Sequence, residues 1–220
     1  MAIQISGTTV IDNSRNLSNI ANATTAATGN TYAIRDASGN LTAANIPTQM
    51  AVYTSPGTFV VPTGTTTLKV TVTGGGGSYQ LPSATVRAGG AGGTGIAVIN
   101  VTPGSSIPLT VGAAGATPPV ATPGGSSTFG SFITATGGGT GAAGGTASFP
   151  APAPSYKSTL TIGGQSGATP LPGASQGKDG GASFWGGNNP TGGAYGSGAT
   201  ITVPTGPYIV GRDGVVVVEW

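Results

Sequence analysis

Runs of glycine interrupt this chain directly after segments that have the pattern of β-strands. Glycine fills residues 74–77 immediately after TLKVTVT, and glycine-dominated runs recur at 89–93, 137–139 and 144–145. Glycine buries no side chain and loses more conformational entropy on folding than any other residue, so such runs are costly. Their recurrence predicts places where the fold needs backbone without side chains.

The charged fraction argues that this glycine-rich chain folds. Glycine and proline account for 42 and 17 of the 220 residues, which alone would suggest low complexity. Disordered chains, however, combine high charge with low hydrophobicity, whereas here 5% of residues are charged and 37% are hydrophobic. We therefore expect a folded protein that relies on backbone hydrogen bonds and on close packing of small residues.

The scarcity of chemically active side chains argues against catalysis and cofactor binding. The chain has no histidine and no cysteine, which excludes histidine-based triads and histidine or thiolate metal ligands. Two matches to the dinucleotide-binding pattern G-x-G-x-x-G lie inside glycine runs, with no helix after them and no acid about 20 residues later. We predict no enzyme activity, no catalytic residue, no cofactor and no metal.

The acidic residues are spread along the chain, at Asp12, Asp36, Asp179, Asp213 and Glu219. A glycosidase needs two carboxyl groups facing one bond across a cleft, and Asp179 and Asp213 are the pair that could meet in space. Their sequences, KDGG and RDGV, are more typical of turns, where Asp and Gly are favoured for backbone reasons. A net charge of +2 without a basic run argues against a nucleic-acid partner.

Short segments of alternating apolar and polar residues, without helical periodicity, predict an all-β fold. Residues 1–50 hold few glycines and are rich in Asn, Thr, Ala and Ile; short strands are expected there, with turns near 12–13 and 38–40. Their apolar content cannot offset the ordering entropy alone, so we expect an attachment or trimerisation segment that orders with other chains. Residues 51–220 form the second predicted domain, which is glycine-rich and β-sandwich-like.

The expected sandwich strands stand out by their alternation. In TLKVTVT, Leu68, Val70 and Val72 share one face, which is typical of a half-buried strand. The terminal GVVVVEW carries valines on both faces, which predicts a strand in the interior of a sheet. The strands that we expect to build the sandwich are 68–73, 96–101, 107–111 and 215–220.

Several glycines recur at every third residue, as at Gly89 and Gly92 or at Gly138 and Gly141. Three residues are the period of a polyproline II helix, in which glycine allows close lateral packing. The tracts would then carry the chain outward from the sandwich as packed polyglycine II helices, with exposed loops between them. Irregular glycine loops are the second interpretation, because a spacing of three arises often in tracts this rich in glycine.

The aromatic residues divide into two groups. Phe59, Phe129 and Phe132 lie in strand patterns, and we expect them in the core. A second set lies between glycine tracts and supplies our receptor-binding candidates: Tyr79, Phe149, Tyr156, Phe184, Trp185 and Tyr195. Tyr and Trp beside Ser, Gly and Asn are typical of binding loops. The alternative for each is that it folds back and caps the glycine region.

Two parts of the sequence resemble tail fibres of tailed bacteriophages. SGTTVIDNSRNLSNI, residues 6–20, looks like a VIDxSRNLxNI segment that recurs in trimeric tail fibres. TFVVPTGTTTLKVTVTGGGG, GGSSTFGSFITATGGG and the closing valine-rich strand with its terminal Trp are similar to glycine-rich tail-fibre domains. A related group, the receptor-recognising adhesins of T-even-type phages, stacks glycine helices and presents variable loops at the tip.

This resemblance implies a virion tail-fibre tip protein that binds the bacterial host surface, at a polysaccharide or an outer-membrane protein. It also implies a homotrimer and an adjoining virion tail protein as partner; a monomer docked on a separate trimeric fibre is the alternative. The implied receptor-facing segments are 78–88, 116–123, 146–160 and 182–190. A purely structural minor fibre or decoration protein without receptor binding is the competing hypothesis.

The start of the chain bears on localisation. MAIQISGTTVI has neither a positive n-region nor a continuous apolar core, so we expect no secretory signal. A virion protein reconciles this start with a composition typical of an extracellular fibre, because it assembles in the host cytoplasm and acts outside after lysis. Secretion by a route that needs no signal is the alternative.

Overall fold

A computed structural model describes much of the chain, in two units. The described residues are 3–5, 8–11, 49–79, 87–116, 120–141, 143–152, 155–168, 179–189, 192–201 and 208–220. Contacts divide the chain into Met1–Pro47 and Thr48–Trp220. In the first unit, β1 (Ile3–Ile5) pairs antiparallel with β2 (Thr8–Ile11). The turns predicted near 12–13 and 38–40 lie outside the described residues.

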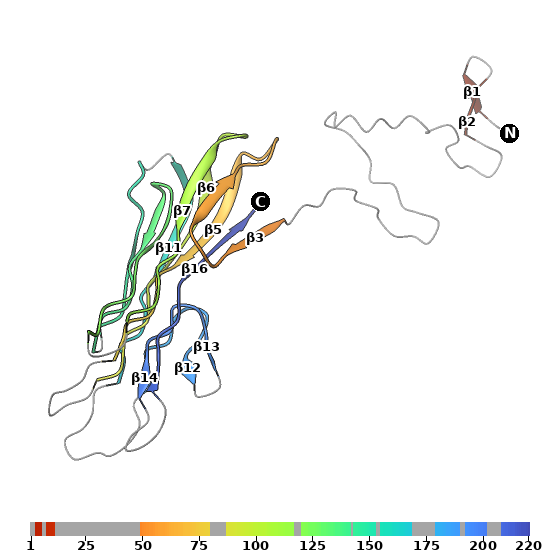
Figure 1. Ribbon diagram of the computed structural model, residues 1–220. Coiled ribbons are helices and arrows are strands. Elements are labelled where there is room, and N and C mark those ends of the chain that lie inside the picture. The colour runs from red at the N-terminus through yellow and green to blue at the C-terminus, as the bar shows by residue number, and fades with distance from the viewer. Residues whose placement is uncertain are drawn as a thin grey trace. The chain divides into compact units, whose positions relative to one another are not determined.

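Two five-stranded antiparallel sheets pack face to face in the second unit, which confirms the predicted all-β sandwich (Figure 1). The strand orders are β11-β6-β5-β16-β3 in the first sheet and β10-β9-β8-β7-β4 in the second. The first sheet consists of β3 (Met50–Tyr53), β5 (Thr67–Thr73), β6 (Thr94–Asn100), β11 (Tyr156–Ile162) and β16 (Val215–Glu219). The second consists of β4 (Gly57–Val60), β7 (Ser106–Thr110), β8 (Ser127–Phe129), β9 (Ile133–Ala135) and β10 (Ala147–Ser148).

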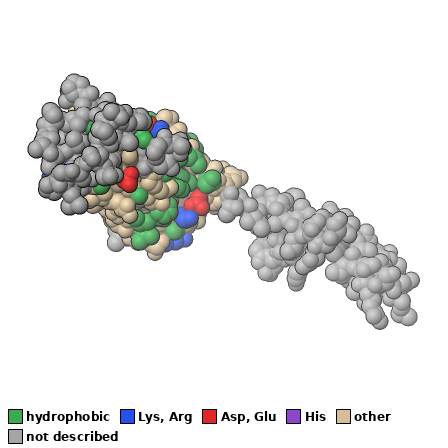
Figure 2. Space-filling view, turned by 90° about the horizontal axis from the view of Figure 1, so that it is seen from below, with side chains coloured by type: hydrophobic (Ala, Val, Ile, Leu, Met, Phe, Trp, Pro, Cys, Tyr) green, Lys and Arg blue, Asp and Glu red, His purple; other side chains and the backbone are tan. Residues whose placement is uncertain are grey.

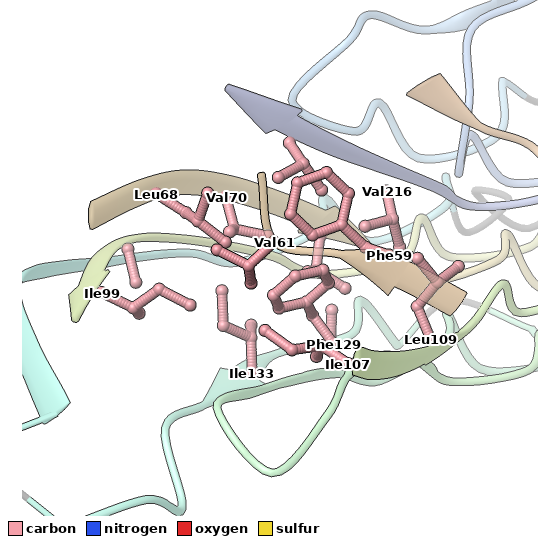
Figure 3. Packing of buried hydrophobic residues seen from close by; sticks show 14 residues of the cluster. Phe59, Val61, Leu68, Val70, Ile99, Ile107, Leu109, Phe129, Ile133 and Val216 are labelled. Atoms are coloured by element: carbon pink, nitrogen blue, oxygen red, sulfur yellow. The ribbon is translucent and has the colours of Figure 1, made fainter. Parts of the chain in front are cut away.

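The hydrophobic core lies between the inner faces of these sheets, where side chains from both point toward one another (Figure 3). Phe59 and Phe129 are buried there, with ring centroids 6.1 Å apart, which confirms them as core residues. Phe132 is partly buried and packs against the same cluster. The buried cluster comprises Phe59, Val61, Leu68, Val70, Val72, Ala97, Ile99, Ile107, Leu109, Phe129, Ile133, Ala135, Val216 and Val218.

The C-terminal strand β16 lies between β5 and β3, which confirms its interior position. Its alternate valines Val216 and Val218 face the core, while Val215 and Val217 on the outer face are 1% and 7% exposed. Strands buried on both faces read as continuous apolar runs, because neither face meets water. The four valines therefore follow from the position of the strand in the sheet.

Strand β5 departs from the expected half-buried pattern. Leu68, Val70 and Val72 point into the core as predicted, but Thr71 and Thr73 on the opposite face are also buried. The expectation was wrong at this end of the strand because another part of the chain covers it. The indole N–H of Trp185 donates to Thr73 Oγ1 over 2.9 Å.

Extended segments without regular sheet pairing continue from the sandwich and run side by side (Figure 1). We call them the glycine bundle; its segments are 74–79, 88–93, 112–116, 124–125, 136–139, 143–145, 163–168, 179–182, 194–199 and 211–214. Two short hairpins accompany the bundle. They are formed by β12 (Asn188–Asn189) with β13 (Gly192–Gly193), and by β14 (Thr200–Ile201) with β15 (Tyr208–Ile209).

Residues 74–77 lie in the middle of the bundle and bond to neighbours on every side. The first and fourth amides of this run donate to segment 88–93, and the second and third donate to the carbonyls of Gly125 and Arg212. Carbonyls of the run accept from three other segments, at the amides of Gly115, Gly138 and Ala199. The donor direction thus repeats after three residues, which is the period of a polyproline II helix.

Residues 89–93 repeat this arrangement. The first and fourth amides donate to segment 194–199, the second and fifth to segment 136–139, and the third to Gln165. Carbonyls of the run accept from segments 74–79, 143–145 and 179–182. Both runs therefore have the hydrogen-bond pattern of packed polyglycine II helices, and the interpretation as irregular loops does not describe them.

Glycine is required in the bundle because neighbouring backbones occupy the space of a side chain. A Cβ atom on Gly76 would overlap the carbonyl oxygen of Ser197, and one on Gly90 would overlap that of Ala143. A Cβ atom on Gly138 would overlap the carbonyl oxygen of Gly90. These close approaches confirm the prediction that the tracts supply bare backbone for packing.

Gly141 has a different role from Gly138, although the two share the spacing of three. Gly141 lies in a turn with a φ angle of 62°, a left-handed conformation that residues with a Cβ atom rarely adopt. Spacing alone therefore did not identify which glycines pack.

Within the described part of the chain, no helix is long and apolar enough to cross a membrane.

Candidate binding surface

Three of the predicted receptor-binding residues gather on one exposed side of the glycine bundle. Phe184, Trp185 and Tyr195 are 46%, 39% and 43% exposed. The rings of Phe184 and Trp185 meet edge to face, with centroids 5.0 Å apart and an interplanar angle of 79°. Large aromatic side chains left open to water in this way provide contact area at low conformational cost.

A tight turn holds this aromatic group in place. Ser183 and Gly186 exchange backbone hydrogen bonds of 2.9 and 3.1 Å, and Gly186 has a φ angle of 124°. The hydroxyl of Ser183 donates to the carbonyl of Tyr195 and accepts from the amide of Trp185 over 3.2 Å. One serine thus links the Phe184–Trp185 turn to the segment that carries Tyr195.

Two charged residues stand beside these rings. Arg212 and Asp213 line, together with Trp185, Tyr195, Gly193 and Ala194, a hollow of about 610 Å³. We call it the Trp185 hollow. The sequence RDGV predicted a turn at Arg212 and Asp213, and neither residue was among the predicted site residues. Their one sequence signal is that two charges stand adjacent in a chain with few charges.

The glycine bundle fixes the backbone of both charged residues. The amide of Arg212 donates to Ser197 over 2.9 Å, and its carbonyl accepts from Gly76 over 2.8 Å. The carbonyl of Asp213 accepts from Gly196 over 2.8 Å. Asp213 also uses Oδ1 to accept from the amide of Ala114 over 2.7 Å, which orients its carboxylate.

A second group, Phe149 and Tyr156, lies at the edge of the sandwich. Both rings are partly buried against the core cluster, with centroids 5.8 Å apart. The hydroxyl of Tyr156 donates to the carbonyl of Phe132 over 2.6 Å and accepts from the amide of Ala151 over 3.0 Å. They line a shallower hollow of about 410 Å³ together with Ala151, Lys157, Ser158 and Thr159. Tyr156 thus has a structural task within its own chain.

Tyr79 is the most buried of the predicted site residues. It is 6% exposed and packs with Ala199 and Ile201 in a small apolar cluster. Its side chain therefore offers little surface to a partner. A role in binding stays a prediction for every residue of the set, but Tyr79 is buried in a cluster separate from the exposed aromatic group.

The small cluster marks the end of the bundle away from the sheets. Beside it, the amide of Gly89 donates to Ala199, and Ala168 bonds to Ala88 and to Asp179 over 3.4 and 3.0 Å. Most of the predicted receptor-facing segment 78–88 lies outside the described residues.

The other segments predicted to face a receptor have different surroundings. Segment 146–160 contributes to β10 and β11 and so belongs largely to the sandwich. Segment 182–190 forms the aromatic turn and β12 on the side of the bundle. Segment 116–123 includes Val120, which is 70% exposed, while residues 117–119 are outside the described part.

The described surface carries few charges. Figure 2 shows a few Lys, Arg, Asp and Glu side chains among hydrophobic and uncharged polar atoms on one face of the molecule. Among the described residues, no group of three or more His, Cys, Asp or Glu side chains could hold a metal ion. Asp179 and Asp213 have different neighbours: the backbone carbonyl of Asp179 accepts from the amide of Ala168, whereas Asp213 lines the Trp185 hollow.

Comparison with known proteins gives one family. A family model described as a glycine-rich domain matches residues 54–216, which is most of the second unit. No curated protein sequence matched the chain.

Proposed function

Since this chain belongs to the glycine-rich domain family over residues 54–216, we propose that the domain is the binding end of a virion tail fibre. In this proposal the protein is assembled into the virion in the host cytoplasm and later recognises the bacterial host surface. The family description names only the glycine-rich domain. The identity as a phage adhesin rests on the resemblance of residues 6–20 and of the glycine-rich segments to tail fibres.

The observation that carries the proposal is an exposed aromatic group mounted on a closely packed backbone. Phe184, Trp185 and Tyr195 are each more than a third exposed, and Trp185 is tied to the sandwich through Thr73. A surface that is already ordered loses little conformational entropy on binding. A purely structural fibre protein would have no need to leave three large rings in water on such a support.

The proposal extends to the partners of the chain. Residues 1–50 would attach the domain to an adjoining virion tail protein and join three copies into a homotrimer. The binding would involve no catalysis, no cofactor and no nucleic acid. The receptor would be a surface polysaccharide or an outer-membrane protein of the host.

Binding to cells tests the main proposal. The purified full chain, labelled with a fluorophore, is incubated with a panel of bacterial strains and measured by flow cytometry. We expect saturable binding to a subset of strains, competed by unlabelled protein. Absence of binding to every strain would favour the alternative of a structural fibre or decoration protein. Release of oligosaccharide from isolated surface polysaccharide would contradict the proposal of binding without catalysis.

Sedimentation tests the proposed assembly. The mass of one chain is 20.9 kDa, so a homotrimer and a monomer are well separated by analytical ultracentrifugation. We expect a trimer for the full chain at micromolar concentration and a monomer for a variant that begins at Thr48. A monomeric full chain would overturn the homotrimer and favour docking on a separate trimeric fibre.

A further inference from the structure

The Trp185 hollow has the composition of a small-ligand site. Its volume of about 610 Å³ falls within the range of about 300–1,000 Å³ typical of ligand sites, which combine aromatic walls with a few convergent polar groups. Trp185 and Tyr195 supply the aromatic part, and Arg212 and Asp213 supply the polar part. The aromatic residues, at 185 and 195, and the charged pair, at 212–213, come from different segments that meet through the glycine bundle.

The indole of Trp185 presents an apolar surface to the hollow. Its only polar atom, Nε1, already donates to Thr73 Oγ1 over 2.9 Å at the buried end of β5. The ring is also supported from the side by Phe184 at 5.0 Å. The part of the ring that remains exposed is therefore carbon, held in one orientation, and suited to contact the C–H groups of a ligand.

The charged groups of the hollow are one acceptor and one donor. The carboxylate of Asp213 can only accept hydrogen bonds, and Oδ1 is already occupied by the amide of Ala114, which leaves Oδ2 for a ligand. The guanidinium of Arg212 can only donate, and it forms no ion pair with a described residue. Both backbones are fixed by the bundle, so little motion is needed to bring these groups onto a ligand.

The aromatic rings and the two opposite charges of the hollow favour some classes of ligand over others. The charges of Arg212 and Asp213 sum to zero, so the hollow offers no net attraction to an anionic or a cationic ligand. A purely apolar ligand would take both charges out of water without replacing their hydrogen bonds. A neutral sugar ring has C–H groups on its faces for the indole, and hydroxyl groups that both donate to a carboxylate and accept from a guanidinium.

The geometry points to the Trp185 hollow as a binding site for a neutral pyranose unit of a surface polysaccharide. Trp185 and Tyr195 would contact the sugar ring, and Asp213 and Arg212 would bond its hydroxyl groups. This inference rests on the proposed function, because it names the receptor chemistry for that role. Affinity for a single short oligosaccharide should be weak, in the millimolar range, and multiplied by the copies in a fibre.

Ligand-observed NMR on the full chain tests the site. Saturation transfer is measured with neutral tetrasaccharides of glucose, galactose and N-acetylglucosamine, and with a sialic acid oligosaccharide as the anionic probe. We expect transfer to at least one neutral tetrasaccharide and none to the anionic one. Transfer only to the anionic probe, or to none of the probes, overturns the inference.

Variants localise the binding. Trp185→Ala, Arg212→Ala and Asp213→Asn should each weaken binding by about tenfold or more. The first two remove a contact to the ligand, and the third replaces a charged acceptor by a neutral donor. Asn keeps an oxygen for the amide of Ala114, so Asp213→Asn preserves the internal hydrogen bond. Lys157→Ala in the second hollow is the matched control and should bind as the parent does. Unchanged binding by the three hollow variants, each folded by circular dichroism, overturns the site.

Cell binding separates this inference from the proposed function. If the parent and Trp185→Ala bind cells equally well, the function stands and the saccharide site in this hollow is wrong. If the chain binds a neutral tetrasaccharide through the hollow but binds no cells, the site stands and the function is wrong. Cell binding that is lost after protease treatment of the cells and persists after removal of their polysaccharide also overturns the saccharide inference.

Discussion

The sandwich and the glycine bundle stabilise the same domain by opposite means. The sandwich buries side chains: Leu68, Phe129 and Ile133 are fully buried between two sheets. The bundle buries backbone, and at Gly76 or Gly90 even a methyl group would overlap a carbonyl oxygen. A strand in the sandwich bonds to at most two neighbouring strands, whereas residues 74–77 bond to segments all around them.

This difference shows that a compact interior does not require large side chains. In the sandwich, stabilisation comes mainly from apolar surface removed from water, at about 25 cal/mol per Å². In the bundle, stabilisation comes from dispersion between closely packed backbones and from backbone hydrogen bonds. One such hydrogen bond contributes about 0.5–1.5 kcal/mol net. Each ordered glycine costs more entropy than other residues, so the bundle has to satisfy its amide and carbonyl groups almost completely.

The two regions are joined by polar side chains. The hydroxyl of Ser127 at the start of β8 is fully buried, donates to the carbonyl of Thr73 over 2.7 Å and accepts from the amide of Gly112 over 2.9 Å. Thr73 and Thr94 bond through their hydroxyls over 2.8 Å at the ends of β5 and β6. These groups satisfy the backbone at the point where sheet pairing ends and the bundle begins.

The largest effect should come from adding one methyl group in the bundle. In Gly90→Ala the new Cβ would overlap the carbonyl of Ala143, and the backbone cannot retreat without breaking bonds to several segments. We expect the free energy of unfolding, measured in urea, to fall by more than about 4–5 kcal/mol. Single substitutions rarely have so large an effect.

Gly163→Ala is the matched control for this substitution. Gly163 is exposed, and its nearest neighbour to an added Cβ is the carbonyl oxygen of Gly145 at 4.0 Å. Because alanine restricts the unfolded chain, we expect a gain of about 0.4–1 kcal/mol. If both Gly90→Ala and Gly163→Ala unfold like the parent, the glycine segments act only as linkers.

The next largest effect should come from the side-chain core. Phe129→Ala removes a fully buried ring between the sheets and should cost about 3–5 kcal/mol of unfolding free energy. Phe184→Ala removes the same side chain at a site that is 46% exposed and should change stability by less than about 0.5 kcal/mol. A larger loss for Phe184 than for Phe129 would contradict the division between core and surface.

An intermediate effect is expected at the junction of the two regions. Ser127→Ala leaves the carbonyl of Thr73 and the amide of Gly112 buried without a partner, which should cost about 1–3 kcal/mol. Ser105→Ala removes an exposed hydrogen bond to the carbonyl of Thr102 and serves as control, with little change expected. Equal stability of both variants in thermal and urea unfolding would show that Ser127 does not link the regions.

The smallest effect is expected on the outer face of the sandwich. Lys69 on β5 and Glu219 on β16 form an ion pair of 2.8 Å across the strands, with side chains 52% and 35% exposed. A double-mutant cycle with Lys69→Ala and Glu219→Ala should give a coupling of about 0.2–1 kcal/mol, reduced by salt. A coupling that is larger and insensitive to salt would be inconsistent with an exposed pair.

Local pattern was sufficient to predict part of the sandwich. The alternation in residues 67–73, the valine run of β16 and the strand positions of Phe59 and Phe129 each depend on which neighbours a strand has on its two faces. In residues 67–73 the alternation with period two indicates these neighbours, and in β16 the continuous apolar run indicates them. The burial of Thr71 and Thr73 was not predicted, because the segments near them are distant in sequence; Trp185, which bonds to Thr73, lies 112 residues away. Segment 146–160 was predicted to face a receptor, but it contributes β10 and β11 to the sandwich.

The recurring glycine runs predicted places where the fold needs backbone without side chains, since glycine loses more conformational entropy on folding than any other residue. The partners of each glycine run could not be predicted, because glycine has no side chain whose pattern would reveal its neighbours. Gly138 packs and Gly141 turns, although both fit the spacing of three.

The candidate site, too, was predicted from the sequence only in part. Its exposed aromatic residues were among the sequence candidates, whereas burial of Tyr79 and the approach of Arg212 and Asp213 to Trp185 depend on how distant segments cross in the bundle. Hydrogen bonds between backbones form with any residue type, so the amino-acid sequence records that the bundle exists but not which segments meet in it.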